Sequence, residues 1–526
     1  MATDRSDNVY LVGFFSGSFI AFGNDTIQNP DPSISIGYLV KYSSTGQELW
    51  SRGNTGGTAV INSVATDHDN NVYISGYLLS SQVDSVVFDN LVLPTANIIS
   101  FFLVKYDSAG TALWAISDTD QSHISRGASV AADIHGNVYI TGTYFYAVTF
   151  DTITLLDTSP NGSGASFITK CDPSGHVVWA RSAIGQNGAN AYSIATDINN
   201  NIYITGQGDS INFGNGVNAY PATNGIQSDF FLAKYDSSGR AQWARHSTNG
   251  GTSATGNYVT CDNKGHVCIT GQYASDSIEI GSFTLYNSHV GYQTFFVAQY
   301  DTSGTPLWAR TVSGPATFST GYGLAVDADG AVYVTGAFAQ TDTITFDSTT
   351  IFAQKDTADP AFIVTYSSDG TLLCVTALQS GGDDQNGVAV DHLGNVYVGG
   401  DFMKVNLMVG MDTLPLTGSE NAFIAKYKCS YKLTSGTDPI SMPGTLMLYP
   451  DPFSTTATVQ YTLPEYVKGA QLIITDMLGR QTATYTLEHS SGEIAISSAG
   501  ISSGVYLYSV VADGGVIATR RMVIEK

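Results

Sequence analysis

One six-residue phrase recurs along most of this chain at intervals of about 64 residues, and it restricts the possible folds more than any other feature. It describes a short strand, rich in β-branched and aromatic residues, that usually ends at a glycine. The seven copies read NVYLVG, NVYISG, NVYITG, NIYITG, HVCITG, AVYVTG and NVYVGG, beginning at Asn8, Asn71, Asn137, Asn201, His266, Ala331 and Asn395. This recurrence predicts a repeat protein in which each repeat forms a small β-sheet rather than a pair of helices.

Each repeat divides into four short segments with strand character. Turns rich in Asn, Ser and Gly join the segments, and a variable stretch follows the second one. In the fourth repeat the segments are 192–197, 202–205, 230–236 and 240–245. Four antiparallel strands, each too short to be stable alone, make up one blade of a β-propeller. We therefore expect an all-β chain with a seven-bladed β-propeller in residues 1–430.

The fourth segment carries every tryptophan of the chain, always at the same position of the repeat. These residues are Trp50, Trp114, Trp179, Trp243 and Trp308, and Cys374 takes the place in the sixth repeat. A large aromatic side chain that recurs in successive blades is well suited to pack between neighbouring blades. We interpret the tryptophans as packing residues, and we expect truncation of one to alanine to cost about 3–5 kcal/mol of stability.

The two ends of the repeat array are unequal. Residues 2–4 align with the end of a first strand, and the seventh repeat stops after Lys426 and Tyr427 without its fourth strand. We therefore expect incomplete terminal blades that lie side by side, with Tyr10 and Tyr397 in neighbouring blades. The first residues also lack the basic and apolar stretches of a signal peptide, and we expect that an upstream segment with this signal is missing from the sequence.

These repeats resemble the SBBP-type β-propeller repeat of bacterial secreted proteins, whose core reads D-x-x-G-N-x-Y-x-T-G. The resemblance covers residues 1–430 and is specific because of the sevenfold recurrence. Three residues depart from the pattern: Cys268 replaces the tyrosine, and Gln299 and Thr365 replace a lysine of the third strand. The resemblance implies a propeller and no particular activity.

After Cys429 the repeat pattern ends. Residues 431–446, which include the Pro443-Gly444 pair, have the composition of a short polar linker. Residues 447–526 contain alternating strand-like segments over about 80 residues, and this pattern predicts a small, immunoglobulin-like β-sandwich.

The segments of this second domain resemble the C-terminal sorting domain of the type IX (Por) secretion system of Bacteroidetes. The Y-P-N-P, D-x-x-G-R and G-x-Y motifs of that family correspond here to Tyr449, Pro450 and Pro452, to Asp476, Gly479 and Arg480, and to Gly504 and Tyr506. The resemblance implies that the protein interacts with the type IX secretion machinery and reaches the outer-membrane surface or the extracellular space. It also implies that the sorting domain is often cleaved after export.

The charge of the chain excludes two classes of partner. Acidic side chains outnumber basic ones by 45 to 22, which gives a formal net charge of -23. A chain of this charge is repelled by phosphate backbones and by anionic lipid, so we expect it to bind no nucleic acid. No run of about 18 apolar residues occurs, so we expect no transmembrane segment.

Few arrangements in the sequence carry catalysis or bind metals. It has no H-E-x-x-H or Walker motif, and its one G-x-S-x-G match, at residues 500–504, is not followed by the helical pattern of a nucleophile elbow, so we expect no catalytic residue, cofactor or metal site. The turns 67–71 and 327–330 are rich in Asp but lack the bidentate Glu of a calcium loop, and we interpret them as hairpin turns. Asp107, Gly110 and Trp114 are similar to the Trp-docking motif of quinoprotein propellers, but a β-turn with blade packing explains them better.

Two cysteines, Cys261 and Cys268, depart from the repeat within one hairpin. If the turn is centred on Lys264 and Gly265, the cysteines lie opposite each other with Cα atoms about 4.5 Å apart, and they can form a disulfide in an oxidising compartment. Cys374, which replaces a tryptophan, is expected to be a buried apolar substitute.

Two functional interpretations remain open. The first is a secreted or cell-surface propeller that serves as a scaffold for binding or adhesion, with an unknown extracellular ligand that is a glycan or a protein. Its variable stretches between second and third strands would present the contact surface. The alternative is an enzyme that uses the central funnel on polysaccharide, or a quinoprotein-like oxidoreductase. An enzyme should place carboxylates or histidines at unique positions, whereas the inner strands repeat small and apolar residues, so we favour the scaffold.

Overall fold

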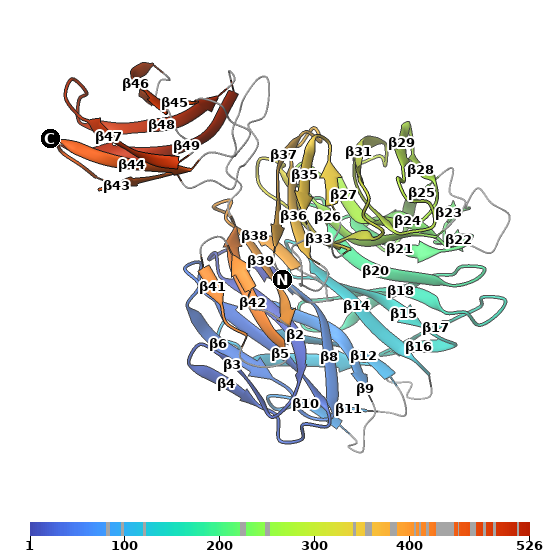
Figure 1. Cartoon of the computed structure of the whole chain (residues 1–526). Helices are drawn as coiled ribbons and strands as arrows, with labels where there is room; N and C mark the ends of the chain where they lie inside the picture. The colour runs from blue at the N-terminus through green and yellow to red at the C-terminus, as the bar shows by residue number, and fades with distance from the viewer. Residues whose placement is uncertain are drawn as a thin grey trace. The chain divides into compact units, whose positions relative to one another are not determined.

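The structure is a computed structural model of the whole chain, and the residues that it describes contain β-strands and turns and no helix (Figure 1). The chain clusters into two compact units, residues 1–431 and 432–526. The description covers residues 1–526 except 80–84, 96–98, 119–122, 221–227, 248–252, 340–342, 353–359, 379–386, 404–406, 410–411, 417–419, 428–445, 451, 463–469, 477–479, 488–490, 513–514 and 526.

The first unit is built from antiparallel sheets whose strands follow chain order, as the repeat pattern predicts. We call these sheets blades. Blade 1 is β1 (Ala2–Thr3), β2 (Val9–Ser16), β5 (Ser35–Tyr42) and β6 (Glu48–Gly53); blade 2 is β8 (Thr58–Thr66), β9 (Val72–Leu79), β12 (Ile99–Tyr106) and β13 (Ala112–Ser117). Blade 3 is β14 (Ser125–Ala132), β15 (Val138–Tyr144), β18 (Ala165–Cys171) and β19 (Val177–Ala183); blade 4 is β20 (Ala189–Thr196), β21 (Ile202–Gly208), β24 (Asp229–Tyr235) and β25 (Ala241–His246). Blade 5 is β26 (Ala254–Cys261), β27 (Val267–Tyr273), β30 (Thr294–Tyr300) and β31 (Pro306–Ser313); blade 6 is β32 (Ser319–Val326), β33 (Val332–Phe338), β36 (Ala361–Tyr366) and β37 (Leu372–Leu378); blade 7 is β38 (Gly387–Val390), β39 (Val396–Met403) and β42 (Glu420–Tyr427).

The variable stretch of each repeat forms a small hairpin of its own. The pairs are β3 (Phe19–Phe22) with β4 (Asp25–Gln28), β10 (Ser85–Phe88) with β11 (Leu91–Pro94), β16 (Ala147–Phe150) with β17 (Ile153–Leu156), β22 (Ile211–Asn212) with β23 (Asn218–Ala219), β28 (Ser277–Ile280) with β29 (Phe283–Tyr286), β34 (Thr343–Phe346) with β35 (Thr349–Phe352), and β40 (Leu407–Val409) with β41 (Asp412–Leu414). A further short strand, β7 (Thr55–Gly56), pairs with β10. We call these pairs the side hairpins. The sequence predicted only loops of variable length in these places.

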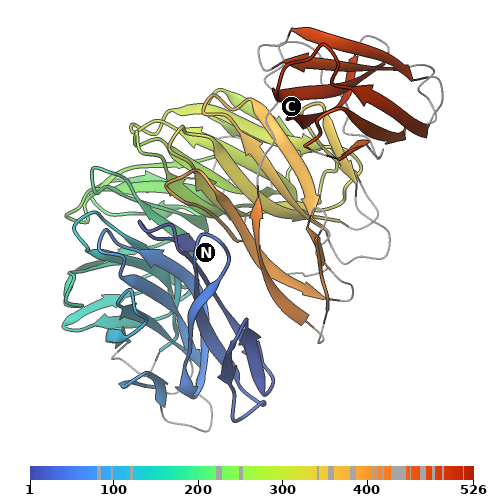
Figure 2. The same cartoon turned by 90° about the vertical axis from the view of Figure 1, so that its left-hand side faces the viewer.

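The first strands of the blades are neighbours in chain order. Contacts join β8 to β14, β14 to β20, β20 to β26, β26 to β32 and β32 to β38, and β1 contacts both β8 and β38. The Thr3 hydroxyl donates to the Val390 carbonyl at 2.8 Å, and the Thr3 carbonyl accepts the Thr66 hydroxyl at 2.8 Å. Blade 1 and blade 7 therefore lie side by side, as Figures 1 and 2 show for their blue and orange strands.

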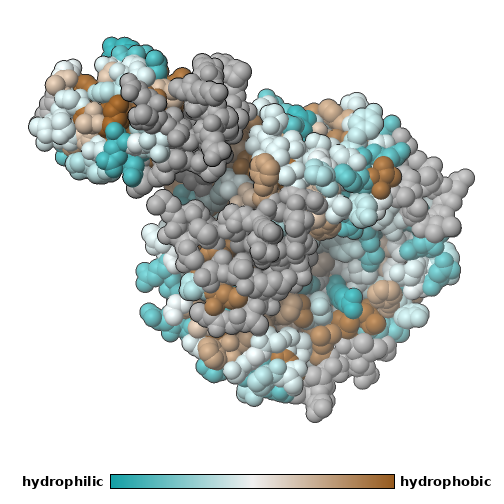
Figure 3. All heavy atoms as spheres, in the orientation of Figure 1, coloured by the Kyte–Doolittle hydropathy of each residue, from teal (hydrophilic) through white to brown (hydrophobic). Residues whose placement is uncertain are grey.

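The hydrophobic core lies between neighbouring blades rather than in one central cluster. Between blades 3 and 4, for example, Tyr139 and Trp179 pack with Ile194, Ile204 and Phe231. Each blade thus buries both of its faces, which explains why the strands read as continuous runs of β-branched and aromatic residues. On the face shown in Figure 3, apolar residues form small separate groups among more polar ones.

The predicted opposition of Cys261 and Cys268 is wrong. In the β26–β27 hairpin, Cys261 is opposite Val267 and Cys268 is opposite Thr260, so the real register differs from the predicted one by one residue. A shift of one residue turns a side chain to the other face of a sheet. Cys261 accordingly packs between blades 4 and 5, Cys268 packs between blades 5 and 6, and both thiols are free.

Cys374 also differs from its expected role as a simple apolar substitute, because it is disulfide-bonded. Cys171, Cys261 and Cys268 are free thiols. The fifth cysteine of the sequence, Cys429, lies outside the described residues.

The second unit consists of two antiparallel sheets that share one core. The first contains β43 (Leu446–Tyr449), β44 (Thr456–Thr462) and β47 (Ser491–Ser497), and the second contains β46 (Gln481–Leu487), β45 (Ala470–Asp476), β48 (Gly504–Ala512) and β49 (Gly515–Ile524). Val459 from the first sheet and Leu472, Ile474 and Met522 from the second are completely buried in the same cluster. The alternation of apolar and polar residues that the sequence shows here therefore places one face of each sheet inside.

Candidate functional sites

The aspartate that recurs in the hairpin turns is occupied by hydrogen bonds inside its own repeat. In blade 4, one carboxylate oxygen of Asp197 accepts the backbone N–H groups of Asn199 and Asn201, each at 2.9 Å. The other oxygen accepts the Asn201 side-chain amide at 2.7 Å and the Tyr203 hydroxyl at 3.0 Å. The same contacts surround Asp4, Asp67, Asp133 and Asp391. The most strongly recurring polar residues of the repeat thus hold a turn and do not form a reaction centre.

Blade 5 keeps the turn aspartate but replaces the residues around it. Cys268 stands in the tyrosine position, and Gln299 in the lysine position donates to its sulfur at 3.3 Å. The Gln299 side-chain oxygen accepts the indole N–H of Trp308 at 3.1 Å. Burial raises the pKa of the Cys268 thiol to about 12, which makes this cysteine a poor nucleophile. The departures from the repeat therefore form one buried, neutral set of packing residues.

A second recurring contact, which we call the clasp, joins each tryptophan to the next blade. The Trp179 indole N–H of blade 3 donates at 3.2 Å to the Ser237 carbonyl, which lies in the turn between the third and fourth strands of blade 4. Gly239 in that turn has φ 78°, and a Cβ on it would lie 2.8 Å from the Trp179 ring. The same indole contact is made by Trp50, Trp114, Trp243 and Trp308. The tryptophans pack between neighbouring blades, as the sequence predicted.

An arginine stands two residues after the tryptophan in blades 1, 3, 4 and 5. It completes the clasp in blades 1, 3 and 4, whereas Arg310 of blade 5 stacks on Trp308 at 5.9 Å and donates to the Ala309 carbonyl at 2.9 Å. In blade 3, Arg181 Nε donates to the Gly239 carbonyl at 3.1 Å, Nη2 to the Ser238 carbonyl at 3.3 Å and Nη1 to the Ala180 carbonyl at 2.8 Å. Its guanidinium carbon lies 5.4 Å from the centre of the Trp179 ring, within the range of a cation–π contact. Arg52 and Arg245 make the same set of contacts.

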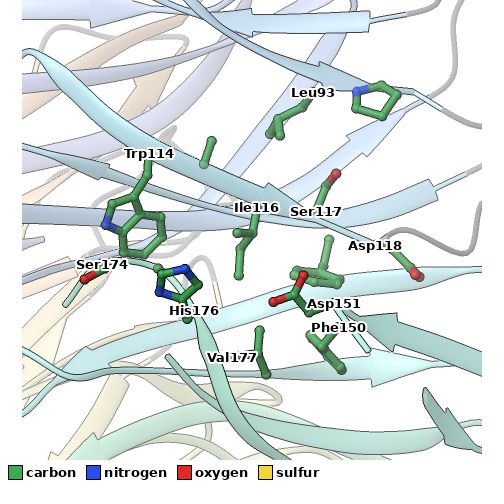
Figure 4. Close-up of a pocket in the computed structure, with 14 residues that line it drawn as sticks. Leu93, Trp114, Ile116, Ser117, Asp118, Phe150, Asp151, Ser174, His176 and Val177 are labelled. Carbon is green, nitrogen blue, oxygen red and sulfur yellow. The ribbon is translucent and has the colours of Figure 1, made fainter. Parts of the chain in front are cut away.

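Blade 2 has Ile116 in the arginine position, and a cavity of about 510 Å³ lies there against blade 3. We call it the interblade pocket. Trp114 and Ile116 of β13 line it, together with Phe150 of β16 and Gly175 in the turn before β19 (Figure 4). Trp114 lies at one end of the view and Asp118 at the other, with Ile116 between them. The pocket is therefore lined by the residue in the arginine position and by the turn residues whose counterparts the arginine contacts in blades 1, 3 and 4.

The interblade pocket combines apolar walls with two carboxylates. Asp118 is almost fully buried, and its oxygens accept the Ser125 hydroxyl at 2.8 Å and the Thr149 N–H at 3.0 Å. Asp151 is exposed at the tip of the β16–β17 side hairpin. Among the described residues, no lysine or arginine lines the pocket, and its one titratable base, His176, is exposed. The pocket thus favours a cationic group over an anionic one.

Another buried acid has no acidic counterpart at its position in the other repeats. Asp229, the first residue of β24, accepts the Ser247 hydroxyl at 2.6 Å and the Phe230 N–H at 2.8 Å, and His246 Nδ1 lies 4.0 Å from its carboxylate. Burial raises the pKa of Asp229 to about 7. Sequence reasoning missed this residue, although its position, directly before the recurring Phe-Phe strand and unlike its counterparts, was a usable signal.

The predicted sorting-motif residues occupy both sheets of the second unit. Tyr449 ends β43 with an exposed ring, and its hydroxyl donates to Glu493 Oε1 at 2.9 Å. Pro450 and Pro452 follow it and are exposed. Phe453, which the motif comparison did not single out, is buried, and its backbone bonds to Val523 and Glu525 tie this segment to the chain end.

The other two motifs meet on the second sheet. Asp476 at the end of β45 is opposite Tyr506 of β48, and Gly504 at the start of β48 is opposite Ile524 of β49. Tyr506 is buried, and its hydroxyl donates to the Ser502 carbonyl at 3.0 Å. Arg480 is exposed just before β46, and Gly479 lies outside the described residues. The motifs thus mark strand ends and a core tyrosine of the two-sheet unit.

Comparison with known families finds one match in each unit of the chain. Residues 447–525 match the secretion system C-terminal sorting domain, and residues 178–214, which cover β19 to β22, match the beta-propeller repeat. Both resemblances that the sequence motifs suggested are therefore confirmed. In the described part of the chain, no helix has the length and apolar character needed to cross a membrane.

Individual proteins add little to these family matches. The chain is 26% identical over 450 residues to an uncharacterized WD repeat-containing protein of Acanthamoeba polyphaga mimivirus, a match that covers 76% of this chain and 29% of that relative. A glycoside hydrolase family 32 structure from Bifidobacterium adolescentis aligns with 100% of this chain and 95% of its own at 10% identity and a TM-score of 0.27. Dimeric latent PorU from Porphyromonas gingivalis aligns with 88% of this chain and 32% of its own at 11% identity and a TM-score of 0.15. TM-scores of this size do not indicate a shared fold.

The two family matches agree with the geometry, because the propeller match falls on successive blades and the sorting-domain match falls on the two-sheet unit. A sorting domain of this kind acts through the type IX secretion machinery and indicates a secreted or cell-surface destination. The chain thus carries a beta-propeller repeat at residues 178–214 and a secretion system C-terminal sorting domain at residues 447–525.

Proposed function

We propose that this protein is a surface or secreted binding scaffold, delivered by its C-terminal domain and built on a closed seven-bladed propeller. Residues 1–430 are the propeller, residues 431–446 a linker, and residues 447–526 an immunoglobulin-like sorting domain. The observation that carries the proposal is the family match at residues 447–525, which supplies a destination outside the cell. The ligand of the scaffold is then an extracellular molecule.

Contacts between blades 7 and 1 support closure of the propeller. The Lys41, Lys105 and Lys234 ammonium groups each donate to a carbonyl in the turn of the following blade. Lys426 of blade 7 donates in the same way to the Ser44 carbonyl of blade 1 at 3.4 Å, and the Tyr397 hydroxyl donates to that carbonyl at 3.2 Å. The boundary between the terminal blades thus has the same kind of lysine contact as the boundaries inside the array.

The distribution of polar groups supports binding rather than catalysis. The recurring aspartates are committed to turns, and Asp229 is bonded to its own neighbours. The interblade pocket, by contrast, has about 510 Å³ of space and lies partly under side hairpins, through Leu93 and Pro94 of β11 and Asp151 beside β16. A pocket of about 300–1,000 Å³ with apolar walls and a few polar groups is typical of a binding site.

Deletion of the sorting domain tests the proposal. A version that carries a signal peptide and ends at residue 446 should fold, resist protease like the full chain, and accumulate in the periplasm of a host that has the type IX system. The full chain with the same signal peptide is the control and should reach the cell surface. Normal surface delivery of the shortened protein would contradict the proposed export route.

A further inference from the structure

We propose that the interblade pocket binds the guanidinium group of an arginine side chain, presented by a basic segment of a partner protein. The proposal deepens the binding role proposed above by naming the site and the chemistry of its partner. It is carried by the clasps of the same molecule, in which an arginine of the chain itself occupies the corresponding space.

The clasps of blades 1, 3 and 4 define what this space recognises. Each guanidinium donates to three carbonyl groups: two in the turn of the next blade and one directly before the arginine. The Nε group donates to the turn glycine carbonyl at 2.7 Å for Arg52, 3.1 Å for Arg181 and 2.7 Å for Arg245. Each guanidinium also stacks on its tryptophan, at 5.3, 5.4 and 4.9 Å from the ring centre.

Blade 2 retains this cradle although it lacks the arginine. The Trp114 indole N–H donates to the Pro173 carbonyl at 3.1 Å, as the other tryptophans do in their clasps. A Cβ on Gly175 would lie 2.8 Å from the Trp114 ring, so the turn of blade 3 sits in its usual place. The residues that supply the three carbonyls are then Ala115, Ser174 and Gly175, and all three line the pocket. Ile116 cannot donate to any of them.

One feature distinguishes the pocket from a clasp that has merely lost a side chain, and a second adds to its charge. Asp118 stands where blades 1, 3, 4 and 5 have Asn54, Ala183, Ser247 and Val312, so among these blades only blade 2 has a carboxyl group at this position of the repeat. Asp151 adds a second, exposed carboxylate at the rim. Opposite charge of this kind steers a basic segment to the site and stabilises it there.

The walls of the pocket fit the rest of an arginine side chain. Leu93, Phe150 and Val177 provide apolar surface, against which the methylene stem of an arginine packs while its charged end reaches the carbonyls. A planar guanidinium matches several carbonyls and an aromatic face at once, whereas a lysine ammonium is a compact, strongly hydrated charge. We therefore expect arginine to be preferred over lysine.

Peptide binding to the full chain tests the proposal. The probe is a capped pentapeptide with one central arginine between leucines, and its matched controls carry citrulline or lysine in place of the arginine. By calorimetry at low salt, we expect the arginine peptide to bind about tenfold more tightly than the citrulline peptide, because citrulline keeps the shape but loses the charge. Equal affinity for the arginine and citrulline peptides, or no binding of the arginine peptide, would overturn the proposal.

Two variants connect binding to the pocket. Ile116→Arg restores the side chain found in blades 1, 3 and 4, so it should fill the cradle from within, keep the melting temperature at or above that of the unchanged protein, and abolish peptide binding. Asp151→Asn changes an exposed group, so it should weaken peptide binding without affecting the fold. This variant still tests the site if Ile116→Arg fails to fold. Peptide binding that survives in both variants would contradict the proposed site.

The proposed function and this inference can fail separately. Ile116→Arg should be exported like the unchanged protein, because it lies outside the sorting domain. Loss of peptide selectivity together with normal surface delivery would refute the arginine site alone. Arginine-selective binding in vitro, together with export that ignores the sorting domain, would refute the delivery route alone.

Discussion

Asp229 differs from the recurring aspartates because burial, rather than turn geometry, dominates its behaviour. The turn aspartates accept several hydrogen bonds each, whereas Asp229 has fewer donors and a pKa raised to about 7. A carboxyl group in this state binds a proton more tightly in the folded chain than in the unfolded one. The residue therefore couples folding to pH.

This coupling has a definite sign. Between the ordinary value of 3.8 and the raised pKa of about 7, folded Asp229 keeps its proton while the unfolded form has lost it, so its contribution to stability is complete below 3.8 and is lost as pH rises through 7. Asp229→Asn should therefore flatten the decline of the melting temperature between pH 4 and pH 8. Parallel melting profiles for the variant and the unchanged protein would rule out this role. The ring of His246 lies 4.0 Å away, and His246→Gln is the control for its influence.

At the scale of elements, the sequence predicted the recurring strands better than the parts between them. The tryptophan strands and the Asp-x-x-x-Asn-x-Tyr turns were recognisable because the same side chains must meet the same neighbours in every blade. The side hairpins were missed because their length varies, although Phe150-Asp151 and Phe346-Asp347 both mark the turn of one. Side hairpins vary because each packs at the edge of its blade and need not match its counterparts.

Registers and cavities were the hardest features to predict. The predicted centre of the β26–β27 turn was wrong by a single residue, and this error placed Cys261 and Cys268 opposite each other on one face. In the structure Cys261 is opposite Val267 instead. The interblade pocket was invisible because its sequence signal, Ile116 in place of an arginine, becomes meaningful only when the arginines of other blades are seen to fill the corresponding space. A recurring pattern predicts the contacts that all blades share. The interblade pocket arises where one blade differs from the others, and the pattern alone does not predict it.

The clasp gives a matched pair of glycine substitutions. Gly239 and Gly46 occupy the same turn of blades 4 and 1 with φ 78° and 84°, but a Cβ on Gly239 would meet the Trp179 ring at 2.8 Å, whereas none of the described atoms lies within 4 Å of a Cβ on Gly46. Gly46→Ala should cost about 1–2 kcal/mol for the positive φ alone. Gly239→Ala should cost about 1–3 kcal/mol more because the ring must move. If both variants lose the same free energy of unfolding in denaturant, the Trp179 ring moves aside without cost, and the prediction is wrong.

For the whole molecule, the excess of acidic residues sets the response to salt. The net charge of -23 produces repulsion across the folded chain that the unfolded chain partly relieves. The Debye length falls from about 30 Å at 0.01 M salt to about 10 Å at 0.1 M, so added salt screens this repulsion. We expect the melting temperature at pH 7 to rise with sodium chloride over this range. Near the isoelectric point of about 4.5 the rise should nearly vanish, and a rise of the same size there would point to specific ion binding.

The clasp always runs in one direction, from the tryptophan strand of one blade to the turn of the next. Each boundary between blades therefore depends only on the two blades that meet there, and its residues can change without disturbing the other boundaries. Because many boundaries between blades are alike, a repeat protein can lose a structural side chain at one boundary and gain a pocket there. The remaining boundaries still hold the array together. In an array of this kind, selection for a new partner can act on a single blade boundary. The side chain that fills this space at the other boundaries then indicates which chemical group the pocket can bind.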